Sequence, residues 1–269
     1  MRALLKIGFA LLLLAFVLIG VSYSMLRAHG GNGPSSPGSR LVATDKRTLA
    51  RAATSVEVSG PVNLTLRQGP VPSLEVRGEQ RLLANIDTAL DGDTLRIGPR
   101  GILLRHRQPI EVAVTLPTLD NLAVNGSGEH AVSGFGGERI VITLGGSGTV
   151  RFNGRYRDIA ANVHGSGDLE VTGGSSDTVT GDVEGSGRLT LVGSSRSLAA
   201  TLRGSGDIDA RHLRAEEAAL VQEGSGDSAV YASRAVNVSL TGSGDAVVYG
   251  NPDERSVTRH GSGSVVFKD

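Results

Sequence analysis

Three aspartates that follow the same short motif are the first candidates for chemistry in this sequence. Asp207, Asp227 and Asp245 each stand directly after a Gly-Ser-Gly triplet. If copies of the motif stack, these carboxylates form a column of neighbours that repel, and a hard cation such as calcium, bound by oxygen ligands, would compensate. The alternative is that each carboxylate accepts hydrogen bonds from nearby turn amides and is solvated. Both interpretations stay open from the sequence alone.

Two tyrosines and a basic loop are candidates for surface binding. Tyr231 and Tyr249 both lie five residues past a triplet. We expect them to stack as an outward pair, either as a platform for a sugar ring or as a structural cross-strand pair. Arg105 and Arg107 belong to a basic, proline-bounded loop that either contacts an anionic lipid or glycan or is merely solvated.

The signatures of common enzyme classes are missing. The six histidines form no HExxH pair, and the sequence has neither a Gly-x-Ser-x-Gly elbow nor a P-loop. Zero cysteines exclude disulfides, thiolate metal sites, a cysteine nucleophile and a lipid-bearing cysteine. We therefore expect no cofactor other than the calcium considered for the aspartate column.

Composition narrows the class of partner. Lys plus Arg number 27 and Asp plus Glu number 27, so the net charge of zero gives no reason to expect nucleic acid as a partner. Five Phe, four Tyr and no Trp leave few aromatic platforms on which a base or sugar could stack.

An internal repeat must position all of these side chains. Gly-Ser-Gly triplets succeed one another at intervals of 18 to 20 residues. Such a fixed period is the signature of a repeat architecture. The triplets begin at Gly126, Gly146, Gly165, Gly185, Gly204, Gly224, Gly242 and Gly261.

Apolar residues alternate with polar ones on both sides of each triplet. Examples are Leu144 before a triplet, and Val150 and Phe152 after it. This period of two is typical of half-buried strands, and two short strands per unit cannot enclose a core alone. Units stacked about 4.8 Å apart pair every backbone group with the next coil. We therefore predict an all-β fold, a parallel β-solenoid or β-helix of about 19-residue coils, with right-handed winding as the default.

The triplet itself allows two structural interpretations. If the chain stays extended, both glycines point inward, and the missing side chains let the opposite wall of the coil come close. Alternatively, the triplet is a corner that needs positive φ.

The domain organisation follows from the same patterns. Residues 51–269 form the predicted solenoid, of which 51–121 are irregular capping coils and 122–269 are the repeats. The capping coils contain alternating runs without the triplet, and Gln80 to Leu90 also fits a helical face. At the other end, Arg255 and Arg259 occupy inward columns, where their charges would blunt an open sheet edge.

The N-terminal region predicts export. After Arg2 and Lys6, residues 7–26 carry no charge, which fits either a cleaved signal peptide or an uncleaved signal anchor in a hydrophobic helix. Residues 27–50 are a predicted flexible linker rich in Gly, Pro and Ser. We expect an exported protein of the periplasm or cell surface, anchored in the inner membrane if the segment is uncleaved.

The segment before the first triplet and the triplets themselves together resemble the GIN-domain family of auto-transporter adhesin head domains. The resemblance covers about Ser55 to Asp269, and its motifs agree in order. They are Pro61 to Leu64, Gln68-Gly69, Pro72 to Val76, Gly92 to Ile97, Val112 to Pro117 and the first triplet at Gly126. The resemblance implies an exported bacterial β-helix-like protein without an assigned biochemical role, and it transfers no catalytic residue.

Two functions from different classes follow. The leading hypothesis is a non-catalytic, adhesin-like envelope module that binds or scaffolds glycan, protein or other copies of itself. The alternative is a polysaccharide lyase or hydrolase, because parallel β-helices host such enzymes and the aspartate column offers carboxylates with a cation.

Overall fold

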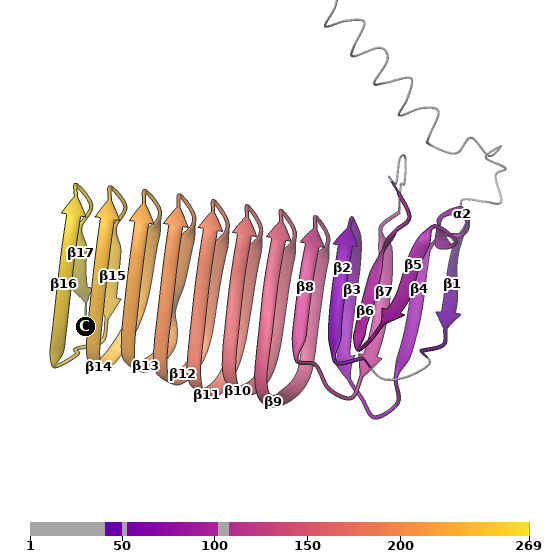
Figure 1. The fold of residues 1–269 in the computed structure, drawn as a ribbon, viewed down its shortest axis with the longest axis horizontal. Coiled ribbons are helices and arrows are strands. Elements are labelled where there is room, and N and C mark those ends of the chain that lie inside the picture. Colours follow the sequence, from indigo (N-terminus) through magenta and orange to yellow (C-terminus); the bar gives the residue numbers. More distant parts are fainter. Residues whose placement is uncertain (1–40, 50–52, 102–107, 269) are drawn as a thin grey trace, which may run out of the picture.

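The chain forms an elongated stack of β coils whose long axis runs along the direction of stacking (Figure 1). The computed structural model describes residues 41–49, 53–101 and 108–268. The predicted signal segment at 1–26 and residues 27–40 and 50 of the predicted linker lie outside this part. Residues 41–49 of that predicted linker are described, and they form strand β1 (Val42–Arg47) paired with β4 (Ser73–Glu79). No helix within the described residues is long and apolar enough to cross a membrane.

We divide the described chain into an N-terminal cap, residues 41–120, and a repeat body, residues 121–268. The cap contains β1 (Val42–Arg47), β2 (Ser55–Gly60), β3 (Val62–Gln68), β4 (Ser73–Glu79), α2 (Gln80–Leu83), β5 (Ile86–Asp91), β6 (Thr94–Pro99) and β7 (Ile110–Leu116). The body contains β8 (Asn121–Gly126), β9 (Glu129–Gly146), β10 (Thr149–Gly165), β11 (Asp168–Gly185), β12 (Arg188–Gly204), β13 (Asp207–Gly224), β14 (Asp227–Gly242), β15 (Ala246–Tyr249), β16 (Glu254–Gly261) and β17 (Val265–Lys268).

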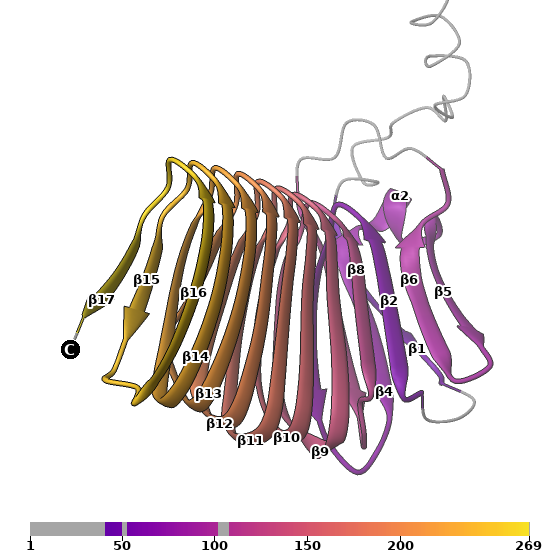
Figure 2. The same ribbon diagram turned by 60° about the vertical axis from the view of Figure 1, so that its left-hand side comes forward.

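Successive coils of the body pair in parallel and in register, as predicted. Strands β9 to β14 each wrap around most of a coil, and every neighbouring pair among them is parallel (Figures 1 and 2). Equivalent side chains therefore lie over one another, and the inward ones form continuous apolar columns. One such column is fully buried: Leu144, Val163, Val183 and Leu202. The β-solenoid prediction is confirmed for this region.

The two glycines of a triplet have different roles: the corner interpretation holds for the first, whereas the second is buried as the other interpretation requires but lies against the preceding coil instead of the opposite wall. The first glycine turns a corner with positive φ in most copies, for example +93° at Gly146. The prediction that it points inward on an extended chain is wrong there. The second glycine is buried, and a Cβ at Gly148 would lie 2.8 Å from the carbonyl oxygen of Gly128 in the preceding coil. Close stacking of backbone on backbone requires glycine at this point.

The cap is irregular, as predicted, but its strands run in both directions. Strand β4 is antiparallel to both β1 and β7, and β5 is antiparallel to β6. The β5–β6 hairpin turns through Gly92, whose φ of +59° suits a two-residue hairpin loop. The ambiguous segment Gln80 to Leu90 becomes one helical turn, α2, followed by β5.

Sequence order and spatial order differ within the cap. Strand β2 lies between β6 and β8, and β3 lies between β7 and β9. The coil formed by β2 and β3 is thus enclosed between a coil that comes later in the sequence and the first repeat. This arrangement joins the cap and the body through one apolar interior, which includes Val56, Leu95 and Leu122.

Arg255 and Arg259 in the last described coil stand in register with the buried Val236 and Leu240, but both arginines are exposed. The Arg255 guanidinium lies 4.6 Å from the centroid of the Phe267 ring. The Arg259 side chain donates to the Gly263 carbonyl oxygen at 3.0 Å. Both arginines are therefore held against the end of the stack, where we expected them to blunt the open edge.

Candidate functional site

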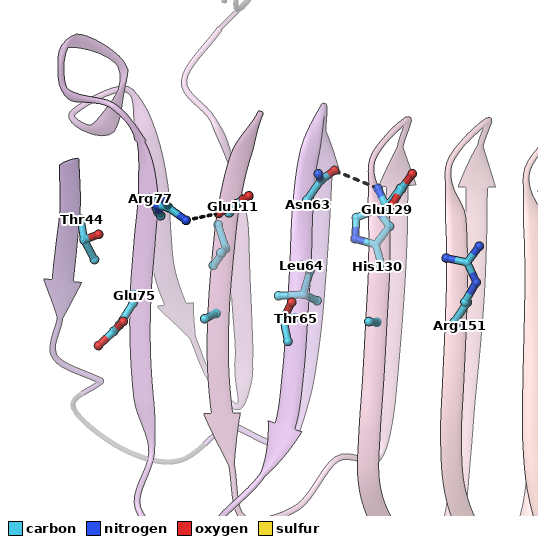
Figure 3. A pocket seen from close by; sticks show the side chains of 13 residues that line it. Thr44, Asn63, Leu64, Thr65, Glu75, Arg77, Glu111, Glu129, His130 and Arg151 are labelled. Atoms are coloured by element: carbon cyan, nitrogen blue, oxygen red, sulfur yellow. Dashed lines mark hydrogen bonds and ion pairs between the residues drawn. The ribbon is translucent and has the colours of Figure 1, made fainter. Parts of the chain in front are cut away.

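Two hollows lie on the strands that follow the Gly-Ser-Gly corners, one toward each end of the described part of the rod. The first is a groove of about 460 Å³ across β4, β7, β3, β9 and β10 (Figure 3). Its charged lining residues are Glu75, Arg77, Glu111, Glu129 and Arg151. They come from strands far apart in the sequence, and the antiparallel placement of β4 brings the first two into the groove.

One ion pair lies within this groove, whereas Glu75 and Arg151 pair with Lys46 and Glu170 outside its lining. The Arg77 guanidinium donates to the Glu111 carboxylate at 3.2 Å. The Asn63 amide oxygen accepts a hydrogen bond from the Glu129 backbone amide at 2.9 Å (Figure 3). Both interactions join neighbouring strands, so they position the groove walls, and the first also pairs two opposite charges.

His130 is a buried residue at this groove to which the sequence analysis assigned no role. It is 2% exposed, and neither ring nitrogen has a hydrogen-bond partner in the described part of the chain. Burial lowers its pKa to about 4, so the ring is neutral near pH 7. His130 pairs in register with Leu64 and Val150, which places it in an inward apolar column. That column position, four residues after Gly126, was the signal available in the sequence.

The three aspartates of the predicted column lie on adjacent coils, but each already has a protein partner. Arg188 donates to Asp207 at 2.8 Å. The Asp227 carboxylate accepts the Asp245 backbone amide at 3.1 Å. In turn, Asp245 accepts both the backbone amide and the hydroxyl of Ser264 at 2.9 and 2.8 Å, and these bonds lower its pKa.

These bonds give the aspartates a structural role as links from one coil to the next. No group of three or more His, Cys, Asp or Glu side chains is arranged to hold a metal ion within the described ranges. The calcium site therefore stays a prediction, and the carboxylate oxygens that it would use are partly committed to amide, hydroxyl and guanidinium donors.

The second hollow contains the predicted tyrosine pair. Tyr231 on β14 and Tyr249 on β15 lie side by side in register, and both are half-buried. With Arg211, His212, Gly250 and Asn251 they line a hollow of about 540 Å³. The prediction that these tyrosines form an adjacent pair is confirmed, and the structure adds the polar residues around them.

Arg105 and Arg107 lie outside the described residues, so their role in anion binding stays a prediction. Arg100, just before them, donates to Asp87 at 3.0 Å, which holds the pKa of that carboxyl below its usual value.

Comparisons with known proteins agree with this architecture. The family described as "Putative auto-transporter adhesin, head GIN domain" matches residues 53–252. No curated protein matches the chain.

Solved structures from Parabacteroides species share the fold. A protein described as a putative lipid binding protein from Parabacteroides distasonis is 24% identical over 85% of this chain and 97% of its own, with a TM-score of 0.79. A putative adhesin from the same organism is 22% identical over 86% and 98% of the two chains, with a TM-score of 0.81. A putative adhesin from Parabacteroides merdae is 17% identical over 85% and 96%, with a TM-score of 0.79.

The family match spans most of the described chain and includes β3, β4, β7, β9 and β10 of the first hollow and β13 to β15 of the second. The repeat, the cap and the triplet corners occur in the order that the resemblance required. The chain therefore belongs to the auto-transporter adhesin head GIN-domain family.

Proposed function

We propose that this protein is a non-catalytic, adhesin-like module of the bacterial cell envelope. The observation that carries the proposal is that both hollows open on the same sheet of a rod whose coils are locked in register. A rigid sheet with separated recesses suits the recognition of an extended partner such as a glycan or a protein surface. Self-association through the same sheet is a further use of such a surface.

Export and tethering complete the proposal. The apolar segment at 7–26 would direct the chain across the inner membrane and, if uncleaved, anchor it there. The Gly- and Ser-rich linker would then hold the rod away from the membrane, in the periplasm or at the cell surface. The family description supports an outward-facing location.

The competing function is a carbohydrate-active enzyme that uses the aspartate column. Its support is the adjacency of Asp207 and Asp227 in register. Against it, Arg188, the Asp245 backbone amide and Ser264 already donate to these carboxylates and so reduce the repulsion that a cation would otherwise relieve.

One experiment separates the two functions. The purified full-length chain is incubated with acidic polysaccharides and with intact bacterial envelopes, with and without calcium. We expect the chain to be retained by envelope material and to release no sugar products. Polysaccharide turnover that the Asp227→Ala variant loses would overturn the proposal in favour of the enzyme, and absence of retention would overturn the adhesin-like role.

A further inference from the structure

The tyrosine hollow arises from a step between two coils of unequal length. The coil that begins at Gly204 has 20 residues before the next triplet, whereas the coil that begins at Gly224 has 18. In the register, Ala210 faces Val230 and Ala215 faces Ala232, so four residues of β13 stand opposite one residue of β14. The extra residues, beginning with Arg211 and His212, form one wall of the hollow.

The floor of the hollow is aromatic and kept accessible by a glycine. Tyr231 and Tyr249 are the aligned residues of neighbouring strands, so their Cα atoms are separated by about one coil spacing of 4.8 Å. Gly250 has a φ of +82°, and a Cβ there would lie 2.4 Å from the Ala232 carbonyl oxygen and 3.1 Å from the Cζ atom of Tyr231. A larger residue at this position would crowd the ring.

Arg211 and Asn251 at the rim of the hollow offer hydrogen-bond donors in set orientations. The Arg211 Nε atom donates to Asp209 at 2.8 Å, and its two terminal nitrogens have no partner among the described residues. The Asn251 amide oxygen accepts from Arg255 at 2.6 Å, which leaves the amide nitrogen as a donor. The fixed guanidinium presents the paired donors that bind a carboxylate bidentately.

We infer that this hollow binds an acidic saccharide, with sugar rings on Tyr231 and Tyr249 and a sugar carboxylate at Arg211. The tyrosine rings provide amphipathic platforms for the apolar faces of pyranose rings. The volume of about 540 Å³ lies within the roughly 300–1,000 Å³ typical of small-ligand sites. This inference rests on the proposed adhesin-like function and names the class of ligand for one of its surfaces.

Calorimetric titration of the full-length chain with tetragalacturonic acid tests the inference, with a neutral galactose oligosaccharide of the same length as the second probe. We expect the acidic probe to bind more tightly than the neutral one. Tyr231→Ala and Tyr249→Ala should each weaken acidic binding at least tenfold, whereas Tyr231→Phe should keep it within about threefold because the ring remains. Arg211→Gln should remove the preference for the acidic probe.

Two control variants and one parallel assay make the outcome unambiguous. Val247→Ala changes the same strand two residues before Tyr249, and Arg139→Gln removes an exposed charge elsewhere, so both should leave the affinity unchanged. No binding of the acidic probe, or equal binding by wild type and the tyrosine variants, overturns the inference. If the chain is nevertheless retained by envelopes, the adhesin-like function stands and only this ligand assignment is lost.

Discussion

The cap and the repeat body are built from similar strands, but the neighbours of each strand are determined in different ways. In the body, the neighbours of each strand are the strands one coil before and after it, and the pairing repeats from β9 to β14. In the cap, β2 pairs with β6 and β8, and β4 pairs antiparallel to β7. Register in the body thus comes from a constant interval, whereas the cap depends on contacts between segments distant in sequence. In the body, the triplet glycines stack closely on the backbone of the preceding coil, whereas Gly92 in the cap has no such neighbour.

The largest effect should come from adding a methyl group where backbone stacks on backbone. At Gly167 in the body, a Cβ would lie 2.5 Å from the Gly148 carbonyl oxygen and 2.9 Å from Leu144. We expect Gly167→Ala to lower the free energy of unfolding by about 3 kcal/mol or more, because the coils would have to separate. Denaturant unfolding of the purified variant measures the loss.

The matched control for this substitution is a cap glycine. A Cβ at Gly92 meets nothing within 4 Å, and only its φ of +59° opposes a side chain. Gly92→Ala should therefore cost about 1 kcal/mol. Equal costs at the two glycines would contradict the difference drawn between cap and body.

The pH dependence of stability tests the packing of His130, which lies on β9 of the body beside Leu64 of the cap. Because burial lowers its pKa to about 4, the unfolded chain, with a pKa near 6.5, binds more protons between these two values. The stabilising contribution of the neutral ring is thus full above about pH 6.5 and is lost as the pH falls toward 4, by about 3 kcal/mol. His130→Leu should remove this part of the pH dependence in unfolding curves collected from pH 4 to pH 7.

Wild-type stability that stays flat over this range would show that the ring is not buried as described. A matched surface change, His164→Gln, is the control for replacing a histidine. His164 is exposed and lies 3.3 Å from Glu184, so its replacement should leave the main loss of stability on acidification in place.

A smaller effect is expected where the body holds the last segment of the cap. The Tyr156 hydroxyl donates to the Leu119 carbonyl oxygen at 2.5 Å, and burial raises the pKa of this hydroxyl. Tyr156→Phe leaves that carbonyl without its donor and should cost about 1–2 kcal/mol. Hydrogen exchange should then speed up mainly in β7 and β8, on either side of Leu119. Uniform acceleration along the whole rod would show that this bond does not act locally.

The sequence predicted the body well because equal intervals determine which residues are neighbours. The spacing of Tyr231 and Tyr249 from their triplets was enough to place them side by side. The same spacing aligned Asp207 with Asp227, although it could not show that Arg188 and Ser264 supply partners to the column.

The cap was predictable only as a set of strands. Alternation of apolar and polar residues predicts a strand but indicates neither its direction nor its neighbours. The pattern around Val56 therefore could not indicate that β6 and β8 flank this strand. The groove in Figure 3 was missed for this reason, since its walls come from strands whose pairing is non-local. The tyrosine hollow depends instead on a two-residue difference in coil length, whose effect on shape appears only once the coils are stacked.

The most direct test of the account measures whether equivalent serines lie in a row along the rod. The chain has no cysteine, so pairs of spin labels can be placed at Ser147 together with Ser205, Ser225 or Ser243 after substitution by cysteine. These partners are three, four and five coils away, and the account predicts label separations that rise by about 4.8 Å for each additional coil. Separations that do not increase in equal steps would contradict in-register stacking, and with it both proposed binding surfaces.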